Sequence, residues 1–265
     1  IGLVGSEMCI RDSYQPKVSL LDDTLVGVEA LCRWNHPVMG MISPTEFIQI
    51  AEEEGLIGDL GKWVLKTACN QLLEWRAELD CVFGVSVNVS PKQFLDEQAM
   101  QWALDFVAKS PISNRLVEFE LTESTLLSNF ETSLDILNRF IGIGCGLAID
   151  DFGTGYSSLS YLGKLPAKTL KIDKSFVHLI ESNLQYRAIV GGIIKLAHSL
   201  GLTVIAEGVE TETQRAILAK ECCDEIQGSL VASPLSPKDF IEWLNHLEIW
   251  RNYSGSGDEQ DRLVS

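Results

Sequence analysis

Seven short apolar runs of this chain each end on a polar residue of a type that proteins use to bind metal ions. The run 146–149 is followed by two acids, Asp150 and Asp151. Oxygen ligands from acids and amides select hard cations such as Mg²⁺, Mn²⁺ or Ca²⁺ over zinc. If the run ends meet in space, they predict a divalent-metal site. The other runs end at Glu29, Asn88, Glu120, Asp173, Glu207 and Gln227.

The adjacent acids Asp150 and Asp151 are the most discriminating of these endings. In an extended strand two neighbours face opposite sides, but a bend at the strand end can turn both carboxylates the same way. One carboxylate could then bridge two metal ions about 3.5–4 Å apart, which suits in-line attack on phosphorus. The alternative is that Asp151 caps the following helix.

Lys171 places a cation beside the predicted metal site, two residues before Asp173. It could orient or deprotonate a metal-bound water, or it could neutralise charge on a phosphoryl oxygen. A plain salt bridge at the strand end is the alternative.

Two further acids each follow a strand-end acid by three positions: Glu123 follows Glu120, and Glu210 follows Glu207. We expect each second acid to brace a loop, with a helix cap as the alternative. The segment 153–158, Gly-Thr-Gly-Tyr-Ser-Ser, follows the aspartate pair and lacks the lysine of a Walker phosphate loop. It is predicted to form a mobile lid that senses metal occupancy rather than a plain turn.

The apolar runs alternate with helical periodicity, which is typical of parallel strands joined by helices. In α/β folds the carboxyl ends of such strands carry the active site. The first four ligand positions are separated by 59, 32 and 30 residues, enough for one βαβ unit between neighbours. Counting the segment 14–20 gives eight strands, the number in a TIM barrel. Helices are predicted at about 45–57, 59–79, 97–109, 131–141, 184–200, 211–220 and 237–247.

The connection between the first two predicted strands is too short for a helix. Only Leu21-Asp22-Asp23-Thr24 separates Leu20 from Leu25. A parallel crossover needs a dozen or more residues, so these strands must form an antiparallel hairpin. The predicted fold is an α/β, TIM-like (β/α)8 barrel with an antiparallel first strand.

The two ends of the chain do not follow this pattern. Residues 1–13 lack a clean period and are predicted to be an N-terminal extension or an artefact of a mis-joined reading frame. Residues 14–250 would form the domain. Residues 251–265 are polar and aperiodic, as expected of a flexible tail.

Composition limits the function classes. The formal charge of −16 argues against a general nucleic-acid or anionic-membrane surface, although bound cations could still attract a phosphodiester. No run approaches the ~20 apolar residues of a membrane span. Seven cysteines show no metal-type spacing, and we expect reduced, mostly buried thiols in a cytoplasmic protein.

Several motifs together resemble the EAL-domain family of bacterial cyclic di-GMP phosphodiesterases. The resemblance covers about residues 14–247. It rests on Glu29-Ala30-Leu31-x-Arg33-Trp34, on Asp150-Asp151-Phe152-Gly153-Thr154-Gly155, and on shorter matches at residues 14–16, 43–48, 86–90, 120–123, 170–173, 206–210 and 227–228. The family fold is a barrel whose first strand is antiparallel.

The resemblance implies a two-metal site for Mg²⁺ or Mn²⁺. One ion would be held by Glu29, Asn88, Glu120 and Asp150, and the second by Asp150 and Asp151. Glu207 would support the metal–water cluster, and Lys171 would contact the nucleophilic water.

The resemblance also implies substrate contacts and a regulatory loop. Arg33 and the backbone around Leu31 would meet a phosphate, Gln227 would bond near the water, and Glu123 would anchor the loop 152–159 that links the metals to a dimer interface. Gln15 counts with the substrate-binding residues. Asp173 and Glu210 would support the substrate site from a second layer.

The implied activity is hydrolysis of one phosphodiester bond of cyclic di-GMP to linear pGpG, in a homodimer. One departure motivates an alternative: the strip 229–233, Ser-Leu-Val-Ala-Ser, lacks the aromatic residue usual after Gln227-Gly228. A missing stacking surface would cost about 1–3 kcal/mol per base. A receptor that binds cyclic di-GMP without cleaving it is therefore the alternative. An enolase-type barrel is disfavoured because it needs a capping domain before the barrel.

Overall fold

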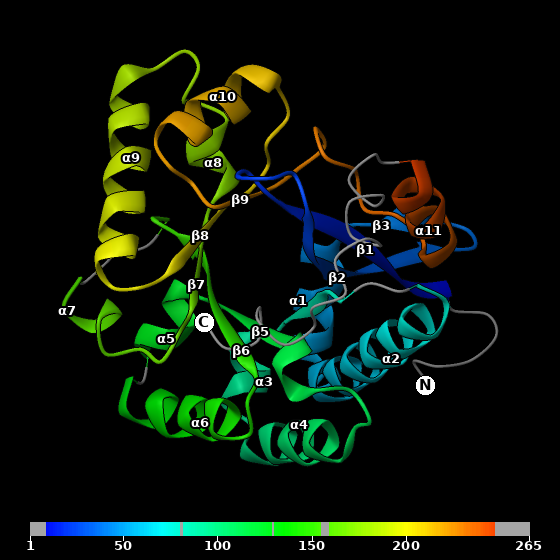
Figure 1. Cartoon of the computed structure of the whole chain (residues 1–265). Helices are drawn as coiled ribbons and strands as arrows, with labels where there is room; N and C mark the ends of the chain where they lie inside the picture. The colour runs from blue at the N-terminus through cyan, green and yellow to red at the C-terminus, as the bar shows by residue number, and fades with distance from the viewer. Residues whose placement is uncertain (1–8, 80–81, 129, 155–158, 247–265) are drawn as a thin grey trace.

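Eight strands close into a barrel in the computed structural model, which describes residues 9–79, 82–128, 130–154 and 159–246 (Figure 1). A ninth strand, β3 (Gly40–Ile42), pairs only with the far end of β2. The predicted α/β barrel is confirmed. The barrel strands are β1 (Cys9–Ser19), β2 (Leu25–His36), β4 (Gly84–Asn88), β5 (Val117–Thr122), β6 (Gly146–Phe152), β7 (Thr169–Ile172), β8 (Thr203–Ala206) and β9 (Glu225–Gln227).

Strand β1 is antiparallel to both of its neighbours, β2 and β9, whereas the other barrel strands pair in parallel. The turn between β1 and β2 contains Asp23, whose φ of 56° lies in the left-handed region that aspartate tolerates. The hairpin predicted from the short connection is therefore confirmed. Its register sets Gln15 opposite Glu29.

Strand β1 begins earlier than the predicted domain boundary. Cys9 pairs with Asn35, and the pairing continues through Ser13 to Tyr14. The folded strand thus starts five residues before Tyr14. That residues 1–13 are an extension or an artefact stays a prediction, and the predicted tail 251–265 lies outside the described residues.

All seven predicted helices are present. The structure also has short helices between them that the sequence analysis did not predict. Turns of four residues carry too little periodicity to be read from sequence, and local caps define them instead: Ser90 accepts from the Gln93 amide, and Asp173 accepts from the Ser175 amide. The helices are α1 (Pro44–Glu53), α2 (Ile57–Glu78), α3 (Pro91–Phe94), α4 (Glu97–Lys109), η1 (Asn114–Leu116), α5 (Glu123–Ser128), α6 (Phe130–Gly142), α7 (Leu159–Leu162), α8 (Lys174–Val177), α9 (Leu184–Ser199), α10 (Glu212–Lys220) and α11 (Pro237–His246).

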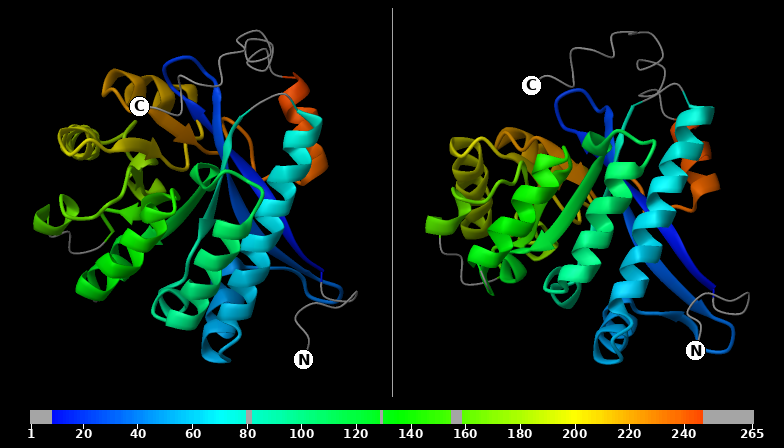
Figure 2. Two further views of the ribbon diagram at one scale, coloured as in Figure 1. Left: turned by 60° about the horizontal axis from the view of Figure 1, so that its bottom comes forward. Right: turned by 90° about the horizontal axis from the view of Figure 1, so that it is seen from below.

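Helices α2, α4 and α6 lie side by side against the outside of the barrel (Figure 2). On the β1 side, α11 and α2 enclose an aromatic cluster of Tyr14, Trp75, Phe83 and Phe240. The Trp75 ring centroid lies 4.7 Å from that of Tyr14 and 4.5 Å from that of Phe240. Rings at these distances add packing energy beyond their buried area. The cluster therefore fixes β1 against the outer helices. Among the described helices, none is long and apolar enough to cross a membrane.

Side chains inside the barrel form two polar layers, because positions two apart on a strand face the same way. The upper layer lies at the strand ends and contains the predicted site. The lower layer comes from the positions two residues away on the same strands. Its members are Lys17, Ser86, Glu118, Thr169 and Glu225, of which Lys17, Ser86 and Thr169 are buried.

We predict that Glu225 makes the stability of this protein fall as pH rises. Burial raises the pKa of Glu225 from 4.5 to about 7, with Lys17 opposing the shift and Glu118 adding to it. Between these values the folded chain keeps a proton that the unfolded chain has released, so raising the pH favours unfolding. Glu225 should lower the free energy of unfolding by up to about 3 kcal/mol as the pH rises through this range. Glu225→Gln should remove that fall.

Urea unfolding at about pH 5 and about pH 8 measures the effect. The exposed acid Glu78, mutated to Gln, is the matched control and should leave the slope unchanged. Equal pH dependence in the wild type and Glu225→Gln would contradict the assignment.

Candidate active site

The upper polar layer brings residues of the barrel strands to one mouth. Most lie at or near a strand end, but Glu29, where the sequence predicted a strand to end, is the fifth residue of the twelve-residue strand β2, which continues to His36. Glu29, Glu120, Asp150, Lys171 and Gln227 are buried there. Asn88 is the last residue of β4, and Glu207 follows the end of β8. Parallel strands deliver these side chains to the same edge, which is why the polar endings of the sequence meet.

Lys171 is the centre of this mouth, and its side chain is fully buried. The Nζ atom lies 2.6 Å from Glu120 Oε2, 2.7 Å from Glu207 Oε1, 3.2 Å from Asp150 Oδ1 and 3.3 Å from Glu29 Oε2. Four predicted site acids therefore converge on one ammonium group. A plain salt bridge does not describe an ammonium shared by four carboxylates.

Two amides hold the Glu29 carboxylate from the sides. Asn88 Nδ2 donates to Glu29 Oε1 at 2.6 Å, and Gln227 Nε2 donates to Glu29 Oε2 at 2.7 Å. Gln227 Nε2 also donates to Gln15 Oε1 at 3.0 Å, and Gln15 Nε2 in turn donates to the Ala232 carbonyl. This chain of amides connects Glu29 to the strip 229–233.

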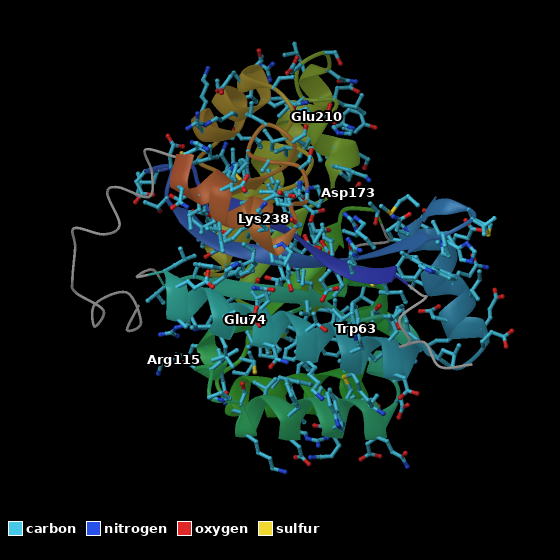
Figure 3. All side chains as sticks on the ribbon, turned by 90° about the vertical axis from the view of Figure 1, so that its right-hand side faces the viewer. Trp63, Glu74, Arg115, Asp173, Glu210 and Lys238 are labelled. Atoms are coloured by element: carbon cyan, nitrogen blue, oxygen red, sulfur yellow. The ribbon has the colours of Figure 1, made fainter. Side chains whose placement is uncertain are left out.

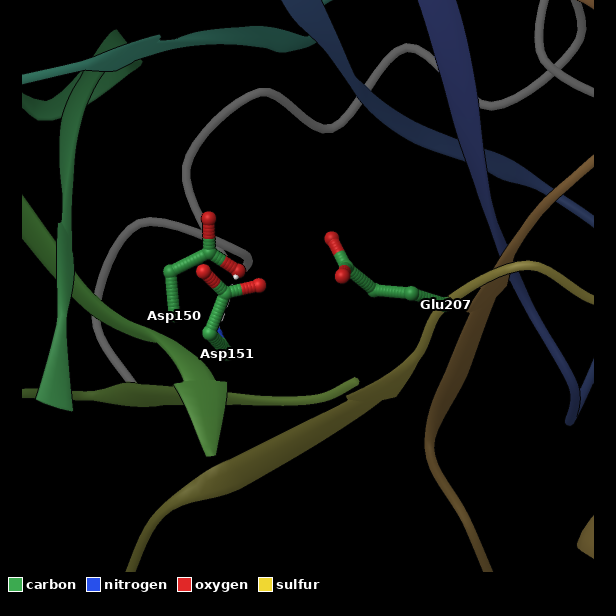
Figure 4. Close-up of side chains that lie close together, drawn as sticks. All are labelled: Asp150, Asp151 and Glu207. Carbon is green, nitrogen blue, oxygen red and sulfur yellow. Dashed lines mark hydrogen bonds between the residues drawn. The ribbon is translucent and has the colours of Figure 1, made fainter. Parts of the chain in front are cut away.

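The aspartate pair bends towards the mouth as predicted. Asp151 has a φ of 53°, and the pairing of β6 with β7 shifts register between Ile149 and Phe152. Ligand oxygens of Asp150, Asp151 and Glu207 lie within 4.8 Å of one another (Figure 4). The next helix of the described residues begins at Leu159, so a helix cap at Asp151 finds no support.

Burial has the largest effect on the pKa values of the acids at the mouth. Burial, reinforced by neighbouring acids and opposed by Lys171, raises the pKa of Asp150 and of Glu207. Burial would also raise the pKa of Glu120, but Lys17 and Lys171 outweigh it and lower that pKa to about 2. Nearby acids hold the pKa of Lys171 well above its ordinary value.

The mouth carries an excess of negative charge that divalent cations would neutralise. Its five acids are Glu29, Glu120, Asp150, Asp151 and Glu207, and they face Lys171 and, through Glu120 alone, Lys17, which also pairs with Glu118. The donors are carboxylate and amide oxygens without sulfur or imidazole, a set suited to hard cations. Such crowding is costly unless cations relieve it. The metal-ligand residues predicted from sequence are Glu29, Asn88, Glu120, Asp150 and Asp151, and the structure brings all of them to this mouth.

The predicted substrate residues lie around the mouth, and among the described contacts no hydrogen bond joins Arg33, Asp173 or Glu210 to the acid cluster. Arg33 Nη1 donates to the Cys32 carbonyl, while the Leu31 carbonyl accepts from Ser13 Oγ. Asp173 caps α8 and adds repulsion that raises the pKa of Asp151. Their roles stay predictions.

Glu210 lies on the segment after β8, next to the segment after β7 that carries Asp173 (Figure 3). His178 Nε2 lies 3.4 Å from Glu210 Oε1, and the Glu210 amide donates to Gln214 Oε1. These contacts fit the prediction that Glu210 braces a loop.

The buried Glu123 meets the start of the predicted lid. Its Oε2 accepts from the Gly153 amide at 3.2 Å, and Thr154 Oγ1 donates to the Asp151 carbonyl. Residues 155–158 of the lid lie outside the described residues. An anchoring role for Glu123 and a lid function stay predictions.

One buried residue escaped the sequence analysis. Lys17 Nζ lies 2.9 Å from Glu120 Oε1 and 3.3 Å from Glu118 Oε2. Its signal in the sequence is weak: it lies two residues after Gln15, on the same face of an extended strand. No periodicity distinguishes such a lysine from an exposed one.

Comparison with known proteins now adds to this geometry. The family model described as "EAL domain" matches residues 10–234. The chain belongs to the EAL-domain family. The match covers the strands that supply the mouth and most of the outer helices.

Curated relatives of this EAL domain include two proteins of Pseudomonas aeruginosa. It is 39% identical over 228 residues to the bifunctional diguanylate cyclase/cyclic di-GMP phosphodiesterase MucR, covering 86% of this chain and 33% of MucR. It is 36% identical to the cyclic di-GMP phosphodiesterase PA2567, covering 91% of this chain and 41% of that protein. The chain thus spans well under half the length of these relatives.

A solved structure matches the EAL domain closely in fold. The PaMucR phosphodiesterase in complex with c-di-GMP superposes with a TM-score of 0.84 at 38% identity, over 87% of this chain and 94% of that one. The barrel and its antiparallel first strand therefore belong to an established architecture.

The mouth carries an excess of buried negative charge when no divalent ions are bound. Asp150→Asn should therefore stabilise the protein when a chelator removes those ions. Loss of one crowded charge is expected to raise the free energy of unfolding at about pH 8 by on the order of 1 kcal/mol. The same variant should lose most of the rise in melting temperature that added Mn²⁺ gives the wild type, since an ion stabilises only the state that binds it.

Thermal unfolding with and without Mn²⁺ tests both effects, with the exposed Asp135→Asn as the matched control. A destabilised chelated variant, or a wild-type Mn²⁺ response in Asp150→Asn, would contradict this view of the mouth.

Proposed function

We propose that this EAL domain hydrolyses one phosphodiester bond of cyclic di-GMP to linear pGpG, using two bound Mg²⁺ or Mn²⁺ ions. The observation that carries the proposal is the convergence of four carboxylates on Lys171, with Asp151 beside two of them as a fifth acid. The names of the relatives MucR and PA2567, and the c-di-GMP in the PaMucR structure, support the substrate.

The acids divide naturally between two ions. Glu29, Asn88, Glu120 and Asp150 would hold one, and Asp150 with Asp151 would hold the other, with Glu207 supporting both. When bound, the ions would acidify the attacking water and neutralise charge on the phosphoryl oxygens. They would also give this protein of net charge −16 a local positive centre for a phosphodiester.

Lys171 would act as a charged hydrogen-bond donor. Four surrounding carboxylates keep it protonated, so orienting the water or neutralising a phosphoryl oxygen suits it better than removing a proton. Gln227 would fix Glu29 from the side through its 2.7 Å bond. The water would release one proton as its oxygen bonds to phosphorus, the bond from phosphorus to the 3′ oxygen would break, and that oxygen would take up a proton, so that one water is added overall.

Arg33 and the backbone near Leu31 would receive a substrate phosphate, with Gln15, Asp173 and Glu210 around them. The strip 229–233 lies beside this region, because the Ala232 carbonyl accepts from Gln15 and the Val231 carbonyl accepts from Trp243 Nε1. Its lack of an aromatic residue favours the second candidate, a receptor that binds cyclic di-GMP without cleavage. A domain from 14 to 250, a homodimer and a cytoplasmic location stay predictions.

Removing one metal ligand tests the hydrolase. Glu29→Ala should lower pGpG formation in Mg²⁺ or Mn²⁺ by more than about 100-fold, since it removes both a ligand and the partner of two amides. Chromatography of the nucleotide products measures the loss, and circular dichroism checks the fold. The exposed Glu131→Ala is the control. Cleavage by Glu29→Ala at the wild-type rate would overturn the proposal.

Ca²⁺ separates binding from turnover. Its loose coordination positions water poorly, so cyclic di-GMP should bind in Ca²⁺ while pGpG forms far more slowly than in Mn²⁺. Calorimetry and the same chromatographic assay report the two properties. Comparable rates in both ions would count against a two-metal reaction, whereas binding without any pGpG in Mn²⁺ would establish the receptor.

A further inference from the structure

Lys17 is a buried cation that no predicted role explains, since its side chain lies beneath the mouth rather than in it. Only 3% of the residue is exposed. Its ammonium group has three hydrogens, and three acceptors surround it: Ser86 Oγ, Glu118 Oε2 at 3.3 Å and Glu120 Oε1 at 2.9 Å. Every donor of Lys17 is therefore used within the chain.

The two oxygens of Glu120 accept from different lysines. Lys17 binds Oε1 from the lower layer, while Lys171 binds Oε2 from the mouth at 2.6 Å. Among the described hydrogen bonds and ion pairs, Lys17 contacts no other acid of the mouth. Oε1 of Glu120 therefore faces the lower layer, and Oε2 faces the mouth.

The lower layer holds Lys17 in place. Glu118 accepts from Ser86 Oγ at 2.8 Å through Oε2 and from Thr169 Oγ1 at 2.7 Å through Oε1. Lys17, Ser86 and Glu118 therefore bond mutually, and Thr169 ties the group to β7. The lysine comes from the antiparallel strand β1. Because β1 pairs with both β2 and β9 and closes the barrel, the Lys17 side chain lies inside it.

We propose that Lys17 is a positioning residue for the cation site: by holding Oε1 of Glu120 from below, it leaves Oε2, the oxygen that Lys171 contacts in the mouth, as the one that an ion can bind. This inference rests on the metal site of the proposed function. Carboxylates bind ions through one or two oxygens, and partners that hydrogen-bond a ligand fix which it does. The competing explanation is that Lys17 only balances the charge of Glu118.

A charge-matched double variant separates these explanations. Lys17→Met with Glu118→Gln removes one positive and one negative charge, so the long-range attraction for cations is unchanged. Replacing a buried ion pair by neutral side chains of similar size is often tolerated. Only the contact with Glu120 Oε1 is lost from the ligand set.

The measurement is the affinity and stoichiometry of Mn²⁺, read from the free-ion signal in electron paramagnetic resonance on the full chain. The wild type should bind two ions. The double variant should bind Mn²⁺ at least about 10-fold more weakly, as when a partner that hydrogen-bonds a ligand is removed. The Mn²⁺ concentration for half-maximal pGpG formation should rise by the same factor, with turnover largely restored at saturation.

Thr169→Val is the control, because it removes a hydrogen bond from the lower layer without touching Glu120. Its dissociation constant for Mn²⁺ should lie within about threefold of the wild-type value, which is smaller than the 10-fold loss expected of the double variant. Lys17→Leu with Glu118→Gln is a second charge-matched pair of substitutions in case the first variant does not fold. Leucine has no hydrogen-bond donor, so this variant should show the same loss.

Three results would overturn the inference, and they differ in what else they affect. Wild-type Mn²⁺ affinity in both double variants would overturn it alone and leave the hydrolase intact, as would an equal loss in Thr169→Val. A wild-type chain that binds no Mn²⁺ would overturn the inference and the proposed function together.

Discussion

Four carboxylates held around one buried ammonium group, with Asp151 beside them, form the constraint on which the rest of this structure depends. Lys171 alone cannot neutralise the mouth, and the pKa values of Asp150 and Glu207 are raised first by burial and further by the neighbouring acids. A folded protein tolerates such a cluster when the surrounding barrel is well packed and a ligand relieves the repulsion. The same excess charge that weakens the ion-free protein is what would draw two cations into the mouth.

Barrel closure is what brings the charges together. The acids come from β2, β5, β6 and the end of β8, and only the shared edge of the parallel strands directs them to one place. The antiparallel β1 closes the ring and contributes residues that no parallel strand supplies. Gln15 extends the amide chain from Glu29 to Ala232, and Lys17 reaches Glu120 from below. The aromatic cluster of Tyr14, Trp75, Phe83 and Phe240 fixes this strand from outside.

Strain at the mouth has a local purpose. Asp151 adopts a left-handed φ that costs free energy for a residue with a side chain, and the bend turns its carboxylate towards those of Asp150 and Glu207. Glu123 binds the Gly153 amide just beyond the bend, so the shape of the mouth and the start of the following loop depend on each other. Active sites commonly retain such locally unfavourable arrangements because the rest of the fold compensates for them.

Short-range features of the sequence predict the eight strands, the seven longer helices, the antiparallel hairpin and the acids of the mouth. These features are the period of apolar residues, the four-residue connection after Leu20 and the polar residue that follows each apolar run. The pairing of each oxygen with its partner depends instead on the folded barrel. Lys17 and Glu120 are about a hundred positions apart, and their contact depends on how the strands close the barrel. The four-residue helices and the φ of Asp151 likewise depend on local caps and on strand register, which periodicity does not record.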